Sequence, residues 1–301
     1  MSFLSAPLTF FMPDSILITG ARGRVGRAIQ MTLGSSCPLR LFSRTASSDG
    51  SVEALDTLLT GDAPLEADFL IHAAWSCVPA NAEERPEQIK QIDLPLLDRL
   101  IDRLQKETRP PLLLFISTGA VYGLAPDRGN REDDTPHPLG VYAKGKLAAE
   151  ERLRASGLPV CILRVGNLYG LPSSPEDRQG VTARLVRCAL TNQPFQRWGD
   201  DPIKDYLHSD DFFSALTRAR GLRLTGTWNV GSGIATPLSH LVELVEKQTG
   251  HPVPILSQPG PAWDVYDNRL DVSRFTRATD WQPTVTLAEG VAREVAALRE
   301  L

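Results

Sequence analysis

Residues 16–26 read Ile-Leu-Ile-Thr-Gly-Ala-Arg-Gly-Arg-Val-Gly. The segment Ile16–Thr19 is apolar except for its last residue and predicts a buried strand, and the segment from Gly26 to Leu33 predicts a helix. The glycines between them form the pattern G-x-x-G-x-x-G in a strand–turn–helix context. That context distinguishes a phosphate-binding loop from an ordinary glycine-rich turn.

The loop has the properties that a dinucleotide pyrophosphate needs. Its glycines permit a tight turn and a close approach of the backbone, and the helix N-terminus supplies N–H groups and a positive dipole end. We therefore expect a dinucleotide cofactor to bind here. The cofactor-binding residues predicted from the loop are Gly20, Arg22, Gly23, Arg24, Val25 and Gly26.

The end of the second predicted strand bears on which dinucleotide binds. That strand, Leu39–Phe42, is followed by Ser43 and Arg44, where an acidic residue would hold the ribose 2′-hydroxyl of NAD. An arginine suits a 2′-phosphate as a planar, charged donor, and Arg22 can reach the same phosphate. NADP(H) is therefore favoured, and NAD(H) stays an alternative if Arg44 is only a solvated residue at a strand end.

Further apolar runs alternate with amphipathic stretches up to about residue 170. The predicted strands are Phe69–His72, Leu112–Ser117 and Val160–Leu163, and the predicted helices span Ile89–Glu107 and Val141–Ser156. Strands that are apolar on both faces and alternate with helices imply a parallel sheet covered on both sides. We expect an α/β fold, a Rossmann-type doubly wound parallel sheet.

The pattern changes after residue 170. Residues Leu171–Arg178 are rich in Pro, Ser and Asp and predict a loop, and helices are expected over Thr182–Leu190, Pro237–Gln248 and Leu287–Leu298. We assign residues 1–170 to the cofactor domain, with strands returning to it from about 204–232. Residues 171–301 are assigned mainly to a smaller C-terminal α/β lobe that binds substrate.

Composition excludes several classes of function. The net charge of −4 argues against a nucleic-acid partner, and no apolar run is long enough to span a bilayer. The N-terminal segment lacks the basic region of a signal peptide. The four cysteines show no C-x-x-C spacing, and the five histidines do not cluster with them. We expect a cytoplasmic protein with reduced thiols and no metal site.

Tyr142 and Lys146 lie four residues apart, and therefore on one face of the helix Val141–Ser156. An ammonium one turn away can lower the pKa of a tyrosine, which can then exchange a proton with an alcohol or ketone. The strand Leu112–Ser117 ends in two hydroxyl residues, Ser117 and Thr118, at the sheet edge where ligands bind. Thr118, Tyr142 and Lys146 are the predicted catalytic residues, and Ser117, Tyr142 and Lys146 are also expected to contact the cofactor.

These motifs, in this order, resemble the extended short-chain dehydrogenases/reductases, specifically the nucleotide-sugar epimerase/dehydratase family. The resemblance covers nearly the whole chain. Two segments besides the phosphate loop carry much of the resemblance, Ile116-Ser-Thr-Gly-Ala-Val-Tyr-Gly123 and Leu163-Arg-Val-Gly-Asn-Leu-Tyr-Gly170. Shorter matching segments begin at His72, Tyr142, Lys204, Trp228 and Asp280.

The resemblance implies further site residues. Ala73 and Ala74 are expected to line the cofactor cleft, and Val165 belongs to a segment that passes the nicotinamide. Asn167 is expected to touch substrate, although a turn or capping role is the alternative. The lobe after residue 170 is expected to hold the nucleotide of the substrate. A homodimer formed through the helices Ile89–Glu107 and Tyr142–Lys146 is also consistent with the family.

Two departures from the family pattern narrow the reaction. Dehydratases of this family carry an Asp-Glu pair directly after the Ser/Thr, and here Gly119 and Ala120 stand in its place. The family usually has Arg where Lys204 stands, and a lysine cannot make a bidentate phosphate contact. Arg197 is the alternative diphosphate ligand, so both residues are kept as candidate substrate ligands.

We therefore expect an NADPH-dependent reductase of a keto sugar nucleotide, with a 4-keto-6-deoxy sugar as the favoured substrate. A nucleotide-sugar C4-epimerase with tightly held NAD(P) is the first alternative. A reductase of other carbonyl compounds and a catalytically silent NADP-binding sensor are the others.

Overall fold

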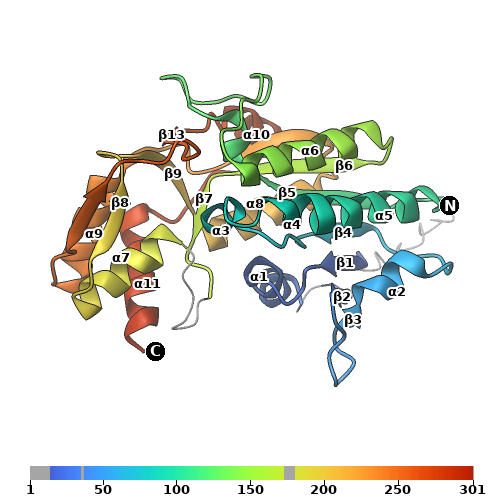
Figure 1. The fold of residues 1–301 in the computed structure, drawn as a ribbon. Helices are drawn as coiled ribbons and strands as arrows, with labels where there is room; N and C mark the ends of the chain where they lie inside the picture. Colours follow the sequence, from blue (N-terminus) through green and yellow to red (C-terminus); the bar gives the residue numbers. More distant parts are fainter. Residues whose placement is uncertain (1–13, 35–36, 173–179, 301) are drawn as a thin grey trace, which may run out of the picture.

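The protein was analysed as a computed structural model that describes residues 14–34, 37–172 and 180–300. Its centre is a seven-stranded, fully parallel sheet with the strand order β10-β6-β5-β4-β1-β2-β3 (Figure 1). The order reverses on either side of β1, as in a doubly wound sheet. The strands are β1 (Ile16–Thr19), β2 (Leu39–Ser43), β3 (Glu53–Ala54), β4 (Phe69–His72), β5 (Leu112–Thr118), β6 (Val160–Val165) and β10 (Gly226–Val230).

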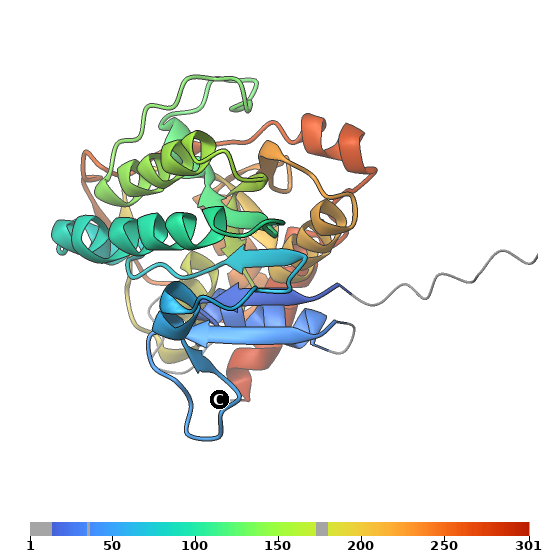
Figure 2. The same cartoon turned by 90° about the vertical axis from the view of Figure 1, so that its right-hand side faces the viewer.

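Helices cover both faces of this sheet, because alternate strand residues point to opposite sides and both sets are apolar. One face packs against α1 (Arg24–Leu33), α8 (Ser209–Gly221) and α10 (Ser273–Thr279). The other packs against α2 (Leu55–Thr60), α5 (Leu94–Gln105) and α6 (Val141–Ala155). Figure 2 shows α5, in teal, and α6, in yellow-green, on the same side of the sheet.

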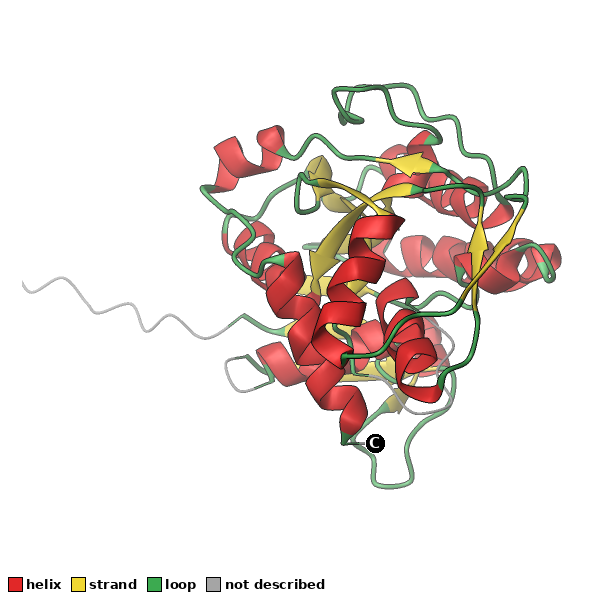
Figure 3. Ribbon diagram, turned by 90° about the vertical axis from the view of Figure 1, so that its left-hand side faces the viewer, coloured by secondary structure: helices red, strands yellow, loops and turns green. Residues whose placement is uncertain are grey.

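A second lobe is built on a smaller sheet, visible beside its helices in Figure 3. Its central strand β9 (Ile203–His208) pairs with β7 (Asn167–Tyr169), β11 (Ala235–Pro237) and β13 (Asp267–Asn268), while β8 (Phe195–Trp198) pairs separately with β12 (Ile255–Gln258). Helices α7 (Val181–Thr191), α9 (Leu238–Thr249) and α11 (Leu287–Arg299) share one apolar core.

The expected α/β doubly wound fold is confirmed, and each predicted strand lies in the large sheet. The segment 204–232 divides between the two parts of the structure: β9 belongs to the smaller sheet, whereas α8 and β10 pack on and into the larger one. The division into domains at residue 170 stays a prediction. Most of the predicted loop Leu171–Arg178 lies outside the described residues.

The helix expected over Ile89–Glu107 is present, but it is not a regular α-helix throughout. It begins as a short helix α4 (Pro86–Gln88), passes through a π-helical turn over Ile89–Asp93, and becomes regular only in α5. In the π-turn the N–H of Leu94 donates to the carbonyl of Ile89, five residues back. Pro95 follows and has no N–H to donate, so the regular hydrogen-bond ladder is interrupted there. This turn changes which residues of the segment face the site described below.

Within the described parts of the chain, no helix combines the length and apolar character needed to cross a membrane. The same residues contain no group of three or more His, Cys, Asp or Glu side chains arranged to hold a metal ion.

Candidate active site

The phosphate loop is packed so closely at Gly20 and Gly26 that neither position has room for a side chain. Gly20 has a φ of +74°, and a Cβ added there would lie 2.5 Å from the backbone nitrogen of Ala74. A Cβ on Gly26 would lie 2.2 Å from the carbonyl oxygen of Gly20. The loop after β1 therefore touches the chain that leaves β4, and helix α1 starts directly behind it at Arg24. This is the geometry that brings backbone N–H groups to a pyrophosphate.

A cavity of about 270 Å³ opens beside this loop, at the carboxyl ends of β1, β2 and β4. It contains seven of the predicted cofactor-binding residues, namely Gly20, Arg22, Gly23, Ser43, Arg44, Ala73 and Ala74. Its glycine cradle, alanine wall and two arginines fit a dinucleotide. Trp75, Ser76 and Asp93 also line it, and of these three Asp93 is the residue that no sequence motif singles out.

The two arginines lie at the end of β2. The Arg22 guanidinium donates to Thr45 Oγ1 and to the carbonyl of Ala46, both at 3.2 Å, and thus lies across the residues that follow Arg44. Both arginines are exposed and no acidic residue stands at this strand end. Three other predicted loop residues do not line the cavity: Arg24 donates to the carbonyls of Leu171 and Pro172, Val25 packs against the core, and Gly26 is buried in α1.

Lys146 lies in an aromatic enclosure next to Tyr142. Its Nζ donates to the carbonyl of Ile116 at 2.9 Å and lies 4.1 Å from the Trp75 ring centroid and 4.7 Å from that of Phe115. The centroid of the Tyr142 ring is 5.9 Å away. Tyr142 and Lys146 therefore lie on one face of α6, as expected, and this face packs against the carboxyl ends of β4 and β5.

Burial controls the electrostatics of this pair. It lowers the pKa of Lys146 to about 7, although the charges of Asp93 and Glu150 act in the opposite direction. Burial also raises the pKa of Tyr142 above its usual value, and the charge of Asp93 adds to that. The expectation that Lys146 lowers the pKa of Tyr142 is therefore wrong for the protein by itself. The ammonium donates to a carbonyl and lies against aromatic rings, and desolvation dominates the pKa of the phenol.

A neutral histidine joins two strand ends behind the lysine. Thr19 Oγ1 and His72 Nδ1 are 2.7 Å apart, and the His72 ring stacks on Phe115. Burial, followed by the nearby charge of Lys146, lowers the pKa of His72 to about 3. His72 therefore adds no positive charge beside Lys146 at neutral pH.

Asp93 is a buried carboxylate in the cavity wall, 4% exposed. It accepts two hydrogen bonds of 2.8 Å from Ser76, one from the backbone N–H and one from the hydroxyl. Burial raises its pKa, and the charges of Lys146 and Arg44 partly counteract this. Asp93 therefore lines the cofactor cavity, and its charge also acts on the Tyr142–Lys146 pair.

The two hydroxyl residues at the end of β5 have different partners. Thr118 Oγ1 accepts from the N–H of Ala120 and caps the short 3₁₀ helix Gly119–Tyr122. The hydroxyl of Ser117 donates to Glu150, away from the cofactor cavity. Only the backbone of Ser117 is left to contact a cofactor while that bond persists.

The remaining predicted residues lie where β6 passes into the second lobe. Val165 is buried at the end of β6, and Asn167 donates through Nδ2 to the carbonyl of Asp205 at 3.2 Å. The Asp205 carboxylate itself accepts from Ser232 and from the N–H of Gly233. Burial raises the pKa of Asp205 to about 6.

The two candidate diphosphate ligands lie on strands of different sheets in the second lobe. Arg197 on β8 donates to Ser257 Oγ at 2.9 Å, and its Nε is buried without a partner among the described residues. Lys204 on β9 donates to the carbonyl of Val265 and lies 3.5 Å from Asp264 Oδ1. Trp198 and Trp263 meet edge to face between these segments, with ring centroids 5.1 Å apart.

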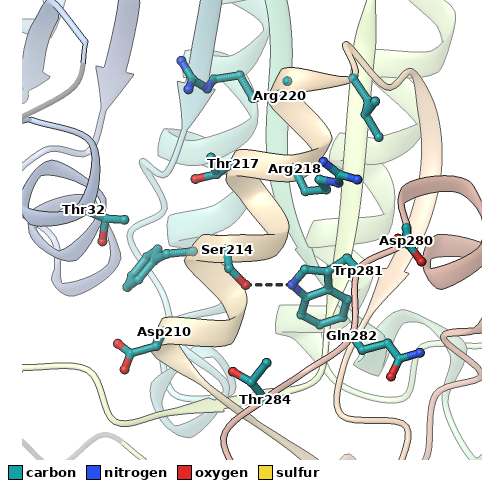
Figure 4. Close-up of a pocket in the computed structure, with 13 residues that line it drawn as sticks. Thr32, Asp210, Ser214, Thr217, Arg218, Arg220, Asp280, Trp281, Gln282 and Thr284 are labelled. Carbon is teal, nitrogen blue, oxygen red and sulfur yellow. Dashed lines mark hydrogen bonds between the residues drawn. The ribbon is translucent and has the colours of Figure 1, made fainter.

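A larger cavity of about 930 Å³ lies away from all of these residues, along the outer side of α8 (Figure 4). There Trp281 Nε1 donates a hydrogen bond of 2.7 Å to Ser214 Oγ, so the indole N–H in the cavity wall already has an acceptor. None of the predicted catalytic or cofactor residues lines it. Size therefore does not identify the site, whereas the convergence of loop, strand ends and helix α6 does.

The sequence model of the NAD dependent epimerase/dehydratase family matches residues 16–231. This chain belongs to that family. Members of the family are NAD(P)-dependent epimerases, dehydratases and reductases, and this chain is an enzyme of that class.

Individual relatives differ in reaction. A UDP-glucose 4-epimerase of Mycolicibacterium smegmatis is 32% identical over 60% of this chain, and the match spans 59% of that relative. A dTDP-6-deoxy-L-talose 4-dehydrogenase (NAD(P)(+)) of Kitasatospora kifunensis is 28% identical over 96% of both chains. Among solved structures, MoeE5 in complex with UDP-glucose and NAD superimposes with a TM-score of 0.82 and 25% identity, covering 95% of this chain and 99% of that one.

Proposed function

We propose that the protein is an NADPH-dependent reductase of a keto sugar nucleotide, with a 4-keto-6-deoxy sugar as substrate. The observation that carries the cofactor choice is the pair Arg22 and Arg44 at the carboxyl end of β2, beside the cofactor cavity. Guanidinium groups bind a 2′-phosphate through charge-assisted hydrogen bonds, whereas a ribose 2′-hydroxyl is better served by a carboxylate.

The proposed reaction adds a hydride and a proton to the carbonyl group of the substrate. When bound, NADPH supplies a hydride to the carbonyl carbon, and the products are NADP⁺ and an alcohol. The carbonyl oxygen takes a proton from the hydroxyl of Tyr142, which is restored from solvent. Thr118 orients that oxygen, and Lys146 provides positive charge beside the tyrosine. The high pKa of Tyr142 keeps the phenol protonated, which is the form that a reductase requires.

The substrate assignment draws on the relatives and on the second lobe. The reverse of a 4-dehydrogenase reaction on a 6-deoxy sugar nucleotide is the reduction of a 4-keto group, and the relative with that name aligns along nearly the whole chain. Arg197 and Lys204 supply positive charge for the substrate diphosphate, and Asn167 stands at the entrance to this lobe.

Elimination of water is not supported by the residues after Thr118. A Cβ added to Gly119 would lie 2.9 Å from the Leu270 side chain, so a carboxylate has no room there unless Leu270 moves. Neither Gly119 nor Ala120 carries a group that can transfer a proton.

The C4-epimerase is the second candidate, because one relative is named as such and a structural neighbour holds NAD and UDP-glucose. The experiment that separates the two is NADPH consumption with a panel of keto sugar nucleotides, after assay of the purified protein for retained cofactor. Stoichiometric NADPH consumption supports the reductase. Interconversion of sugar nucleotides without net consumption, with cofactor that co-purifies, identifies an epimerase. Tight NADPH binding without any turnover identifies the sensor. A homodimer and a cytoplasmic location stay predictions.

A further inference from the structure

Helix α6 carries a third functional candidate on the face that bears Tyr142 and Lys146. Glu150 follows Lys146 by four residues, so the three side chains lie one above the other. Glu150 is 0% exposed. A carboxylate in such a place requires cationic or hydrogen-bonding partners, and here two strands provide them.

The partners come from directly paired positions of β5 and β6. Ser117 and Arg164 are register partners in these strands. The Ser117 hydroxyl donates to Glu150 Oε1 at 2.5 Å, and Arg164 donates through Nη2 to Oε2 at 2.7 Å and through Nε to both oxygens at 3.2 Å. One carboxylate thus fastens α6 to the carboxyl ends of two central strands.

The arginine extends this connection to the next layer. The Arg164 guanidinium lies 4.5 Å from the Tyr122 ring centroid, and the Tyr122 hydroxyl donates to Asn229 Oδ1 at 2.7 Å. Tyr122 ends the 3₁₀ helix that Thr118 caps, and Asn229 is a fully buried residue of β10. The network therefore joins the segment of Thr118 to the helix of Tyr142 and Lys146.

A buried ion pair of this kind contributes little to the free energy of folding, because the desolvation penalty offsets most of the Coulombic attraction. Its effect on geometry is stronger, since the hydrogen bonds are directional and fix both the rotation and the axial position of α6. Displacement of catalytic groups by about 1 Å can cost about a hundredfold in rate.

We propose that Glu150 is a positioning residue, which holds Tyr142 and Lys146 in register with Thr118 and keeps negative charge beside the lysine ammonium. This inference rests on the proposed roles of Tyr142 and Lys146. The charged groups that face Lys146 are Asp93 and Glu150, and those that face Glu150 are Arg164, Arg154 and Lys146. His72 is neutral and does not contribute a competing charge.

The test compares Glu150→Gln with Glu151→Gln, an equal charge change at the neighbouring exposed position of α6. The readouts are NADPH affinity as a function of pH, melting temperature and kcat. Loss of the Glu150 charge lowers the pKa of Lys146, so the pH at which NADPH affinity falls moves downward in Glu150→Gln and stays in place in Glu151→Gln. We also expect kcat of the folded variant to fall by at least about tenfold. A lower melting temperature with unchanged pH dependence and kcat would make Glu150 merely structural and overturn the proposal.

Glu150→Gln leaves the buried Arg164 guanidinium without its carboxylate partner, which can prevent folding. A second variant tests the proposal in that case. Ser117→Ala removes one strand contact and keeps the ion pair. It should retain the wild-type pH dependence while NADPH affinity at pH 6 falls at least about threefold, because α6 is less firmly held. Wild-type affinity in Ser117→Ala would contradict the positioning role. The affinity measurements need no sugar substrate. They therefore still test the positioning role of Glu150 if the wild-type protein reduces none of the keto sugars. Such a result would reject the proposed function alone.

Discussion

The ammonium of Lys146 lies 4.1 Å from the centre of the Trp75 ring. This contact explains why the enclosed Lys146 has a pKa of about 7 rather than its ordinary 10.5. The indole and the Phe115 ring replace water around the ammonium, and the single carbonyl of Ile116 compensates only in part. A cation–π contact recovers some of the desolvation cost but not all of it.

NADPH affinity should therefore depend on pH in the neutral range. Below pH 7 Lys146 carries a positive charge that attracts the phosphates, and above pH 7 it is a neutral amine. Affinity should fall as pH rises through 7, by at most about tenfold per pH unit for a single titrating group. NADPH fluorescence titrations between pH 5.5 and about pH 9, with Lys146→Met as the non-titrating control, measure this. A flat profile in the wild type would contradict the assignment.

Substitution of the indole should move that transition. Trp75→Ala lets water reach Lys146, so the desolvation penalty falls and the pKa of the lysine rises toward its ordinary value. The pH at which NADPH affinity falls should then move upward, opposite to the shift expected for Glu150→Gln. The same titration series measures it, and a downward shift would show that the cation–π attraction, not desolvation, dominates the contact.

Cofactor selectivity should depend on the arginine that follows β2. Arg44→Ala removes a ligand of the 2′-phosphate, so NADPH should lose about 1.5–3 kcal/mol of binding free energy while NADH loses little. Arg40→Ala is the matched control, because Arg40 lies on the same strand and pairs with Glu53 at the surface. KM values for both cofactors are compared in the three proteins. An equal loss for NADPH and NADH in Arg44→Ala would remove the residue from 2′-phosphate recognition.

The phosphate loop should not tolerate even one methyl group at its first glycine. Gly20→Ala places a Cβ 2.5 Å from the Ala74 nitrogen at a φ of +74°. Gly50 has the same φ but no atom within 4 Å of the added Cβ, so Gly50→Ala measures the backbone strain alone. NADPH affinity should be lost in Gly20→Ala and retained in Gly50→Ala. Comparable losses in both would mean that strain rather than close packing explains the glycine.

The parts of the fold and site that the sequence predicts are those encoded locally. The loop Gly20–Gly26 and the apolar strands carry their signals in adjacent residues, and the Tyr142–Lys146 spacing is a property of one helix. Glu150 has the same spacing again, but its importance depends on Ser117 and Arg164 meeting in β-sheet register, which one sequence does not reveal.

Asp93 was missed for a different reason. In a regular helix over Ile89–Glu107 it is one polar position among several. The π-helical turn adds a residue to that turn and rotates the following side chains by about 100°, the angle of one helical residue. Asp93 is the last residue of this turn, and in the structure it lies in the cavity wall, where Ser76 donates to it. The pKa of Tyr142 was mispredicted because helical spacing carries no information on burial.

The central claim is that Tyr142 donates the proton in an NADPH-dependent reduction. The most direct test of this claim measures both turnover and NADPH affinity of the Tyr142→Phe variant. Tyr266→Phe is the control, because Tyr266 is half-exposed. The account predicts that Tyr142→Phe loses turnover of the keto sugar nucleotide while its NADPH dissociation constant stays nearly that of the wild type, and that Tyr266→Phe keeps both. Residual turnover in Tyr142→Phe above about a hundredth of the wild-type rate, the lower end of what a positioned proton donor contributes, would contradict it.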